Sequence, residues 1–349
     1  MELFIYANGF ATAYFIIQSI YLWRRDDKRR IIRILSISYL LWAVMLIKDL
    51  WLAFPQHYTE DWLRAIAFAD GLTVVSYAMI LLELTSPSWV TARRVAWLAA
   101  PFPLFYLWAW MDGGEWSYYV YMVFIILYAL TALGVATKWA QRYIRYVRQN
   151  YSYLKGVDIS WVSYTFAFYI TLQLVWLLIT VVGSPVEDAI YYLMTVVFWE
   201  LFLRKCLTLQ PLSYKEMAEM VEEQNLRKQP LPSYYSFATN FERVMIEEQI
   251  YLRSDLKLGD LAKRFNTNRT YLSTYFTNVV KQTFYDYING LRIEQKGIPL
   301  MKEHPEYSLD YVAEQSGFNS QSTFRRAFKK KTGQTPREFL SELGNDNER

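Results

Sequence analysis

Residues that bind metals or form disulfides are scarce in this chain of 349 residues. Cys206 is its one cysteine, which excludes an intrachain disulfide and a cluster of thiolate ligands. Its two histidines, His57 and His304, are far apart in the sequence and give no ligand cluster for zinc. A glycine-rich phosphate-binding loop is also missing. We therefore expect neither enzyme activity nor a metal or cofactor.

Charged residues are rare in the first part of the chain. Up to about Cys206 the sequence consists mainly of long runs of Leu, Ile, Val, Phe, Tyr and Trp, whereas from about Ser213 it has the mixed texture of a soluble protein. A helix needs roughly 20 apolar residues to cross the ~30 Å hydrocarbon core of a membrane. Pro101 and Pro103 are expected to kink the fourth of the segments that approach this length. These seven segments are residues 3–23, 31–54, 63–84, 95–111, 117–137, 161–183 and 186–203.

Lysine and arginine are missing from every second loop between these segments. The loops at 55–62, 112–116 and 183–188 contain none. Because Lys and Arg are retained on the cytoplasmic side, the N-terminus is predicted outside and the C-terminal part inside a bacterial cytoplasmic membrane. Glu2 replaces the basic start of a signal peptide, which favours a retained first helix. The basic residues of the other loops are Arg24, Arg25, Lys28, Arg29, Arg30, Arg93, Arg94, Lys138, Arg142, Arg145, Arg148 and Lys155, and Arg204 with Lys205 follow the last segment.

A short polar region separates the apolar part from the C-terminal part. Pro211, Pro230 and Pro232 interrupt it around a helix-prone stretch at 214–228. The apolar face of this stretch is weak, so the pattern is consistent with either a solvated linker helix or a dimer-forming stalk. The predicted domains are a membrane region at 1–206, a linker at 207–236, a helical domain at 237–344 and a polar tail at 345–349.

Two segments of the C-terminal domain repeat one pattern of a short helix, a tight turn and a second helix. They are "LGDLAKRFNTNRTYLSTYFTNVV" at 258–280 and "LDYVAEQSGFNSQSTFRRAFKKK" at 309–331. Apolar residues recur at helical spacing in both, and Ala262 and Ala313 occupy matching places where a small residue lets two helices cross closely. Gly317 permits the positive φ that the second turn needs. The pattern predicts two helix-turn-helix units.

Both units, the "YLS" and "LRI" elements and the closing "GF-S-STF-R-FKK-TG-TP-EF" pattern occur in the order and spacing of a known family. Over roughly residues 251–339 the sequence resembles the AraC/XylS family of transcription regulators. The resemblance implies two recognition helices, joined by a linker helix, that enter successive major-groove segments of double-stranded promoter DNA. A homodimer on DNA and contact with RNA polymerase are expected with it.

The charge of this domain is consistent with a surface that faces phosphates. Residues 251–341 contain fifteen Lys or Arg against nine Asp or Glu. The second unit is the stronger predicted reader, because Gln pairs with adenine and Arg with guanine. Outward positions proposed to read bases are Arg269, Thr270, Ser273 and Thr274 in the first unit and Gln321, Ser322, Arg325 and Arg326 in the second. Lys281, Lys329, Lys330 and Lys331 are proposed to hold phosphates.

The linker helix departs from the family pattern. It contains "KGIPLM", with Gly297 and Pro299 where Ala and Leu are usual. Proline in a helix interior costs about 3 kcal/mol and kinks the axis. We therefore expect a changed angle between the two units or an early end of the linker helix.

Five ionisable residues lie in or near the apolar segments, where a charge is costly unless it is paired or wetted. They are candidates for a signal-binding pocket, or else for structural pairs between helices, and we expect Asp70 to pair with Lys48. The outward loops have only about five to eight residues, so the signal is expected to be a small molecule, a lipid or a partner membrane protein. The candidates are Lys48, Asp49, Asp70, Glu83 and Glu200.

Together the sequence predicts an all-α protein, with a seven-span membrane bundle followed by a cytoplasmic double helix-turn-helix domain. The leading hypothesis is a membrane-bound one-component transcription regulator that senses a signal through its membrane region. One alternative is a transporter or channel that carries a regulatory DNA-binding domain, although no internal repeat supports a transport path. Another is a regulator that is only passively anchored.

Overall fold

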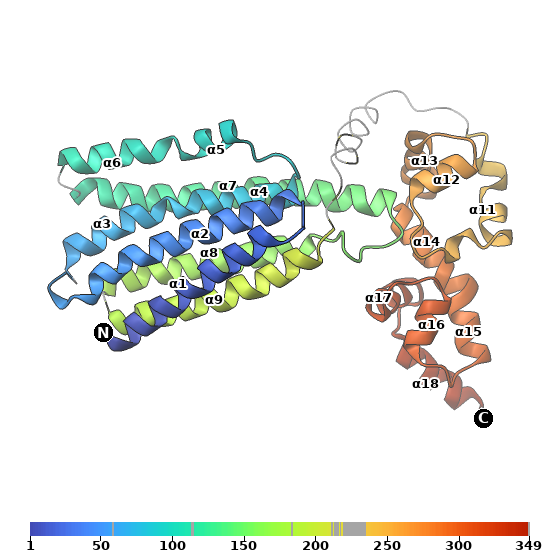
Figure 1. Ribbon diagram of the computed structural model, residues 1–349. Coiled ribbons are helices and arrows are strands. Elements are labelled where there is room, and N and C mark those ends of the chain that lie inside the picture. Colours follow the sequence, from blue (N-terminus) through green and yellow to red (C-terminus); the bar gives the residue numbers. More distant parts are fainter. Residues whose placement is uncertain are drawn as a thin grey trace. The chain divides into compact units, whose positions relative to one another are not determined.

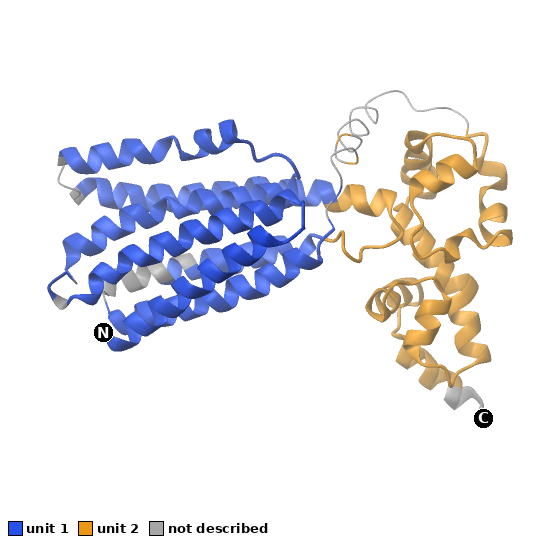
Figure 2. Ribbon diagram, in the orientation of Figure 1, with its two compact units in different colours: residues 1–143, 159–214 blue, residues 144–158, 215–349 orange. Residues whose placement is uncertain are grey.

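The computed structural model describes residues 1–57, 59–112, 115–182, 184–210, 212, 216, 218 and 235–347. Apart from one isolated β-bridge, every regular element in these ranges is a helix. The chain forms two compact units (Figure 2): unit 1 comprises residues 1–143 and 159–214, and unit 2 comprises residues 144–158 and 215–349. The helix predicted at 214–228 lies outside the described residues except for two positions.

Unit 1 consists of long helices that run side by side (Figure 1). By length and composition, four stretches of the described chain could cross a membrane: Glu2–Arg24, Arg30–Ala53, Glu60–Thr85 and Trp116–Asn150. The number of seven spans stays a prediction. The helices are α1 (Glu2–Arg24), α2 (Arg30–Asp49), α3 (Glu60–Gly71), α4 (Thr73–Thr85), α5 (Ala92–Ala99), α6 (Pro101–Asp112), α7 (Glu115–Asn150), α8 (Ser160–Val182) and α9 (Pro185–Thr208), with short 3-10 turns at Leu50–Ala53 and Pro55–His57.

Two of the apolar segments are broken into pairs of helices. The break between α5 and α6 falls at Pro101, as expected, because proline has no N–H to continue the helical ladder. The break between α3 and α4 was not predicted. There the N–H of Leu72 bonds to Ala69 O (3.2 Å), while the carbonyl of Phe68 accepts the hydroxyls of Tyr121 (2.9 Å) and Tyr106 (3.0 Å). Tyrosine hydroxyls thus replace a backbone donor at this break.

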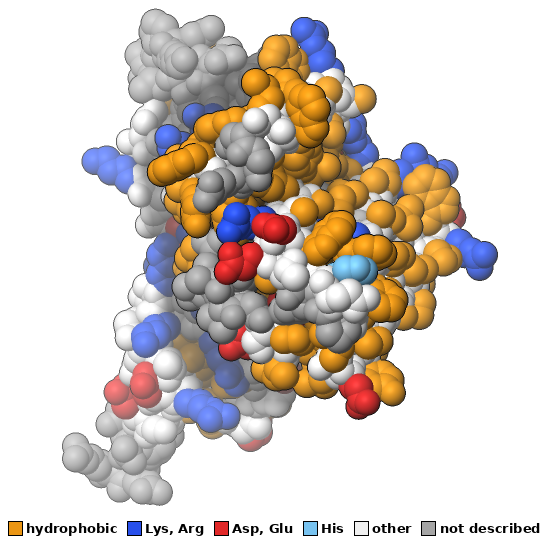
Figure 3. Space-filling model, turned by 90° about the vertical axis from the view of Figure 1, so that its left-hand side faces the viewer, with side chains coloured by type: hydrophobic (Ala, Val, Ile, Leu, Met, Phe, Trp, Pro, Cys, Tyr) orange, Lys and Arg blue, Asp and Glu red, His pale blue; other side chains and the backbone are white. Residues whose placement is uncertain are grey.

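The surface of unit 1 is unusually apolar. Among the described residues, every large hydrophobic side chain that is strongly exposed belongs to unit 1, except Tyr271, Val279 and Tyr311. Figure 3 shows a face on which apolar side chains surround a small group of charged ones. Exposed apolar patches of this extent mark a surface that another apolar phase or molecule covers.

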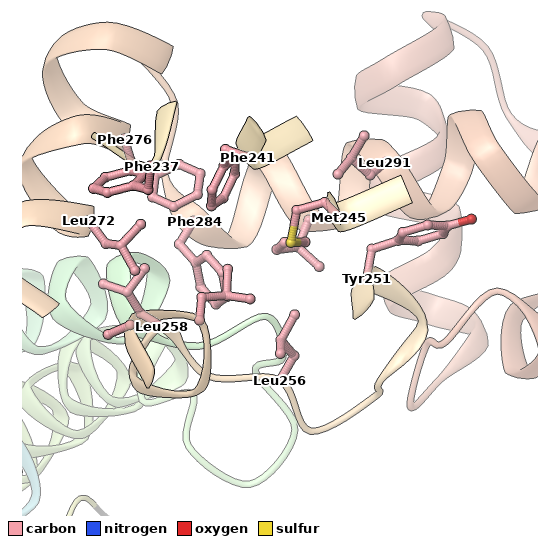
Figure 4. Packing of buried hydrophobic residues seen from close by; sticks show 13 residues of the cluster. Phe237, Phe241, Met245, Tyr251, Leu256, Leu258, Leu272, Phe276, Phe284 and Leu291 are labelled. Carbon is pink, nitrogen blue, oxygen red and sulfur yellow. The ribbon is translucent and has the colours of Figure 1, made fainter. Parts of the chain in front are cut away.

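Unit 2 holds two hydrophobic clusters, one for each predicted helix-turn-helix pair. In the first, Phe241, Leu272 and Phe284 are buried together (Figure 4). In the second, Phe324 and Phe328 are buried among residues of the neighbouring helices. The helices are α11 (Ala238–Glu247), α12 (Leu258–Arg264), α13 (Arg269–Tyr275), α14 (Phe284–Arg292), α15 (Ile298–Glu303), α16 (Leu309–Gln315), α17 (Gln321–Thr332) and α18 (Pro336–Asn347), with a 3-10 turn at Ile250–Leu252 and π-helical turns at Phe276–Val280 and Ile293–Gly297.

The turns within the two pairs follow from local residues. Between α12 and α13, Asn266 has a φ of 48° and Asn268 caps α13 by accepting from Tyr271 N at 2.8 Å. Between α16 and α17, Gly317 has the predicted positive φ of 80°, and a Cβ there would lie 2.4 Å from Leu252 O. Gly317 is therefore required twice, for its dihedral angles and for close packing.

The linker helix does not end early at Gly297 and Pro299, and the changed angle between the two units stays a prediction. The chain stays helical from α14 through a π-helical turn at Ile293–Gly297 into α15. Pro299 follows this turn at the start of α15, and the last bond before it, from Ile298 N–H to Ile293 O, has the wider π-helical spacing. Gly297 is buried, and a Cβ at this position would lie 3.2 Å from Phe324 Cε2. The glycine is thus a close contact between the linker and α17.

This contact predicts different outcomes for two glycines of the linker. Gly297→Leu should destabilise the second helix pair by about 1–3 kcal/mol, because it overpacks a filled core. Gly290→Leu should cost less than about 0.5 kcal/mol, since the nearest atom to its added Cβ is Lys331 Cδ, at 4.0 Å. Hydrogen exchange of the α17 amides in the full-length protein measures both effects, and equal losses of protection would contradict the close approach.

Candidate nucleic-acid interface

Helix α17 presents the predicted base-reading residues of the second pair. Ser320 caps it by accepting from Thr323 N at 3.3 Å. Phe324 and Phe328 point into the core, so the other side of the helix faces solvent. Ser322, Arg325 and Arg326 are exposed there, and Gln321 is half-buried. The structure therefore places these four side chains along one accessible face.

The lysines proposed to hold phosphates differ in their surroundings. Lys329 is exposed. Lys330 Nζ lies 2.7 Å from Asp286 Oδ1, and Lys331 Nζ lies 2.7 Å from Glu294 Oε2. Exposed pairs of this kind contribute little stability, so a phosphate can replace the carboxylate as partner. Lys281 is exposed at the end of a π-helical turn, with a φ of 57°.

A groove of about 770 Å³ connects several of these basic residues. Lys281, Arg326, Lys330 and Lys331 line it, together with Arg148 from the end of α7. The acidic residues along it include Asp286 and Glu294, which already pair with two of the lysines. Its basic side chains come from both helix pairs, so one anionic chain in the groove could contact both.

The first pair presents fewer of its predicted readers. Ser273 is 2% exposed and Thr274 is 7% exposed, so the expectation that they point outward was wrong. In the sequence both lie between the core residues Leu272 and Phe276. The buried side of this segment therefore extends beyond its apolar residues. Thr274 Oγ1 donates to the backbone carbonyl of Thr270, at 2.9 Å. Thr270 itself is half-buried.

Arg269, the charged reader of the first pair, is held by the end of α7. Its Nη2 donates to Tyr146 Oη at 2.7 Å and to Asn150 Oδ1 at 2.9 Å. The guanidinium carbon also lies 5.8 Å from the centre of the Tyr146 ring. Tyr146 and Asn150 are both buried. These contacts lie within unit 2 and engage the side chain that was expected to reach DNA.

Residues 144–158 belong to unit 2, which the sequence did not indicate. Tyr151 forms an antiparallel bridge with Lys257, whose Nζ lies 4.8 Å from the centre of the Tyr151 ring. Ser152 N donates to Leu256 O at 3.0 Å, and Ser152 is fully buried. Asn289 Nδ2 of α14 donates to the carbonyl of Ser152 at 3.2 Å. Backbone and side chains thus dock this segment on the first helix pair.

Arg292 is the buried cation that joins this segment to the linker helix. It is 1% exposed, and its guanidinium donates to the carbonyls of Tyr251, Arg253 and Ser152 at 2.6, 2.5 and 3.3 Å. Burial lowers the pKa of Arg292 to about 10, so it remains charged at neutral pH. Its position four residues after Ile288 on the apolar face of α14 was a sequence signal for burial.

The five ionisable candidates of the apolar segments separate into two groups. Lys48 Nζ lies 2.5 Å from Asp49 Oδ1 and 2.7 Å from Asp70 Oδ1, which confirms the predicted pair of Lys48 with Asp70. Asp49 and Asp70 line a cavity of about 150 Å³ in unit 1.

Glu83 and Glu200 are not in this group and do not line the cavity. Glu83 accepts the N–H groups of Ser88 and Val90, at 2.8 and 3.1 Å, and so fixes the loop after α4. Glu200 accepts from Tyr14 Oη at 3.1 Å and from Arg204 Nε at 2.7 Å. Both make contacts of the structural kind that the sequence left open as the alternative.

The comparison with known proteins concerns the C-terminal part. The sequence model of a helix-turn-helix domain matches residues 261–342. These residues form a helix-turn-helix domain. The match begins inside α12 and ends inside α18, so it includes α13 and α17.

Two of the similar proteins carry the names of regulators. The chain is 26% identical to the Msm operon regulatory protein of Streptococcus mutans serotype c (strain ATCC 700610 / UA159) over 135 residues. The aligned region covers 38% of this chain and 47% of that protein. The chain is 30% identical to an uncharacterized HTH-type transcriptional regulator of Staphylococcus aureus (strain COL) over 91 residues. That aligned region covers 26% of this chain and 12% of that protein. The chain thus spans less than half the length of these relatives. No solved structure matches the chain.

The geometry at Arg292 predicts that a lysine cannot replace it. Arg292→Lys should destabilise unit 2 by about 2–4 kcal/mol, because an ammonium cannot reach the same spread of carbonyls. Arg253→Lys is the matched control, since its side chain is 55% exposed and its ion pairs are 3.8 and 3.9 Å long. Thermal unfolding of the full-length protein and hydrogen exchange at residues 150–158 report the loss. Equal behaviour of the two variants would argue against a central role for Arg292.

Proposed function

We propose that this protein is a membrane-bound transcription regulator that binds promoter DNA through two helix-turn-helix units and is controlled through its membrane region. The match at 261–342 and the names of the relatives support DNA binding and regulation. The exposed face of α17 supplies side chains that can read base edges, and the groove supplies cations for phosphates. A homodimer on DNA and contact with RNA polymerase follow from the resemblance to the AraC/XylS family.

Several features support a membrane location for unit 1. Four described stretches have the length and apolarity of spans, and exposed apolar side chains are concentrated on this unit. The distribution of Lys and Arg over the loops supports a cytoplasmic C-terminal part. In this orientation the ends of α2 and the starts of α3 and α9 lie on the outer side.

The observation that carries the proposal is the course of α7. This helix contains a candidate span, its residues up to Tyr143 belong to unit 1, and its end belongs to unit 2, where Tyr146 and Asn150 accept from Arg269. We propose that the signal acts by shifting or rotating the end of α7 against Arg269. A passive anchor needs no such contact with a DNA-reading side chain.

DNA and α7 then compete for Arg269. Its Nη2 donates to Tyr146 and Asn150, and the same N–H groups would be needed for a guanine or a phosphate. Release of Arg269 from α7 makes the first unit available to DNA. The signal thus acts by changing the relative free energies of a held and a released arrangement.

Recovery of DNA with the membrane-bound protein tests the function itself. Chromatin immunoprecipitation of the full-length protein from membrane fractions should enrich discrete promoter fragments. Arg325→Ala with Arg326→Ala should reduce the enrichment at least about tenfold, because each arginine contributes roughly 1–3 kcal/mol of discrimination. Lys302→Ala, an exposed basic residue on α15, should have little effect. A protein found only in the soluble fraction, or one that enriches no fragment, would overturn the proposal.

Two variants of α7 with opposite expected signs test the competition. Tyr146→Phe removes one acceptor of Arg269 and should tighten DNA binding by about tenfold or less, which is up to roughly 1.4 kcal/mol. Asn150→Asp places a carboxylate against the guanidinium and should weaken DNA binding to a similar extent. Gel-shift titration with a recovered promoter fragment measures both, with Gln141→Ala, exposed on the same helix, as control. Changes of the same sign in both variants would indicate general disruption and refute the competition.

A further inference from the structure

The cavity of unit 1 has the size of a small organic molecule. Its volume is about 150 Å³, and cavities of this volume in protein cores hold molecules as large as benzene. Side chains from α1, α2, α3, α4, α7, α8 and α9 line it. Since helices far apart in the sequence meet at this one space, a ligand there would contact most of the bundle, α7 included.

The charged side chains that line this cavity are all acidic. They are Asp49, Asp70 and Asp188. Lys48 is the neighbouring cation, and it is shared between Asp49 and Asp70. Asp49 also accepts from Tyr192 Oη at 3.1 Å. One ammonium between two carboxylates leaves a net negative charge, which is costly in an apolar bundle.

Asp70 has room for a second partner. Its Oδ1 contacts Lys48 Nζ, and within the described part of the chain its carboxylate has no other hydrogen bond or ion pair. Its side chain is 22% exposed and lines the cavity. A carboxylate in this setting is a site for a cationic group.

The walls of the cavity favour an organic cation over a hydrated metal ion. Trp42, Tyr77 and Tyr169 contribute aromatic rings to the lining, and the remaining lining is mainly aliphatic. Apolar walls of this kind favour the hydrocarbon part of a ligand. A metal ion would require several oxygen ligands in place of these rings.

We infer that this cavity binds a small organic ammonium compound, whose charge pairs with Asp70 and whose apolar part lies against the aromatic wall. The inference rests on the proposed function, since it names the chemical class of the signal. Asp49 ends α2 and Asp188 lies in the first turn of α9. In the proposed orientation both are on the outer side, so the compound arrives from outside the cell. Binding adds the missing positive charge and alters the packing of α7 against the cavity.

Binding is tested on the purified full-length protein in lipid nanodiscs, in the absence of DNA. The probes are n-butylammonium chloride, its neutral analogue n-butanol and potassium chloride, each titrated against the thermal unfolding temperature. n-Butylammonium should raise that temperature in a saturable manner, because a ligand of the folded state stabilises it by mass action. n-Butanol and potassium chloride at equal concentration should not. An equal effect of either control would overturn the assignment.

Three variants locate the site. Asp70→Asn should weaken n-butylammonium binding at least about tenfold, since a buried charge pair is lost. Glu200→Gln removes a carboxylate of unit 1 outside the cavity and should leave binding unchanged. Ala129→Leu narrows the cavity without changing its charge and should also weaken binding. It therefore tests the site even where Asp70→Asn fails to fold. Unchanged binding in the Asp70 and Ala129 variants would overturn the site.

The assay separates this inference from the proposed function. Because no DNA is present, loss of promoter binding in cells leaves the outcome for the cavity unaffected. Absence of n-butylammonium binding overturns the ligand class alone, while the proposed regulation through α7 would stand.

Discussion

The buried guanidinium of Arg292 is the interaction on which the arrangement of unit 2 depends. It carries a full charge at 1% exposure, and backbone carbonyls from two separate segments surround it. A charge in this position is tolerated only when nearly all of its donors are satisfied. Both segments must therefore lie against α14 for either to be stable there. The linker helix, the chain before α12 and the segment at 144–158 are held as one body for this reason.

The partners of the basic side chains in unit 2 are of two kinds, neutral acceptors and carboxylates. The α7 end contributes neutral acceptors, a phenol hydroxyl and an amide carbonyl, to a cation of the first helix pair. Neutral partners bind an arginine more weakly than phosphates do, so DNA can displace them. The lysines of α17 are restrained in the same reversible way by Asp286 and Glu294. Both sets of contacts are of a strength that a polyanion can exchange.

Local patterns in the sequence predicted much of this structure. The two helix pairs, the turn at Gly317 and the pairing of Lys48 with Asp70 each depend on short-range spacing or on the cost of a lone charge. The burial of Ser273 depends on how much of the helix surface is covered by its neighbours. The docking of Ser152 depends on a partner distant in the sequence. Neither can be read from periodicity. Glu83 accepts loop amides and also lies 3.5 Å from Arg30 Nε, which agrees with the alternative of a structural pair.

The unbroken course of α7 has a consequence for the lengths that this chain can tolerate. A helix of 36 residues is about 54 Å long, and each residue turns the chain by about 100° around the axis. The direction in which Tyr146 points, relative to the start of α7, is its rotational phase on the helix. This phase is set by the number of residues before Tyr146 and hardly by their identity. Many exchanges of one apolar residue for another along the helix preserve that phase. A single inserted or deleted residue changes it by about 100° while leaving the hydropathy of the helix almost the same.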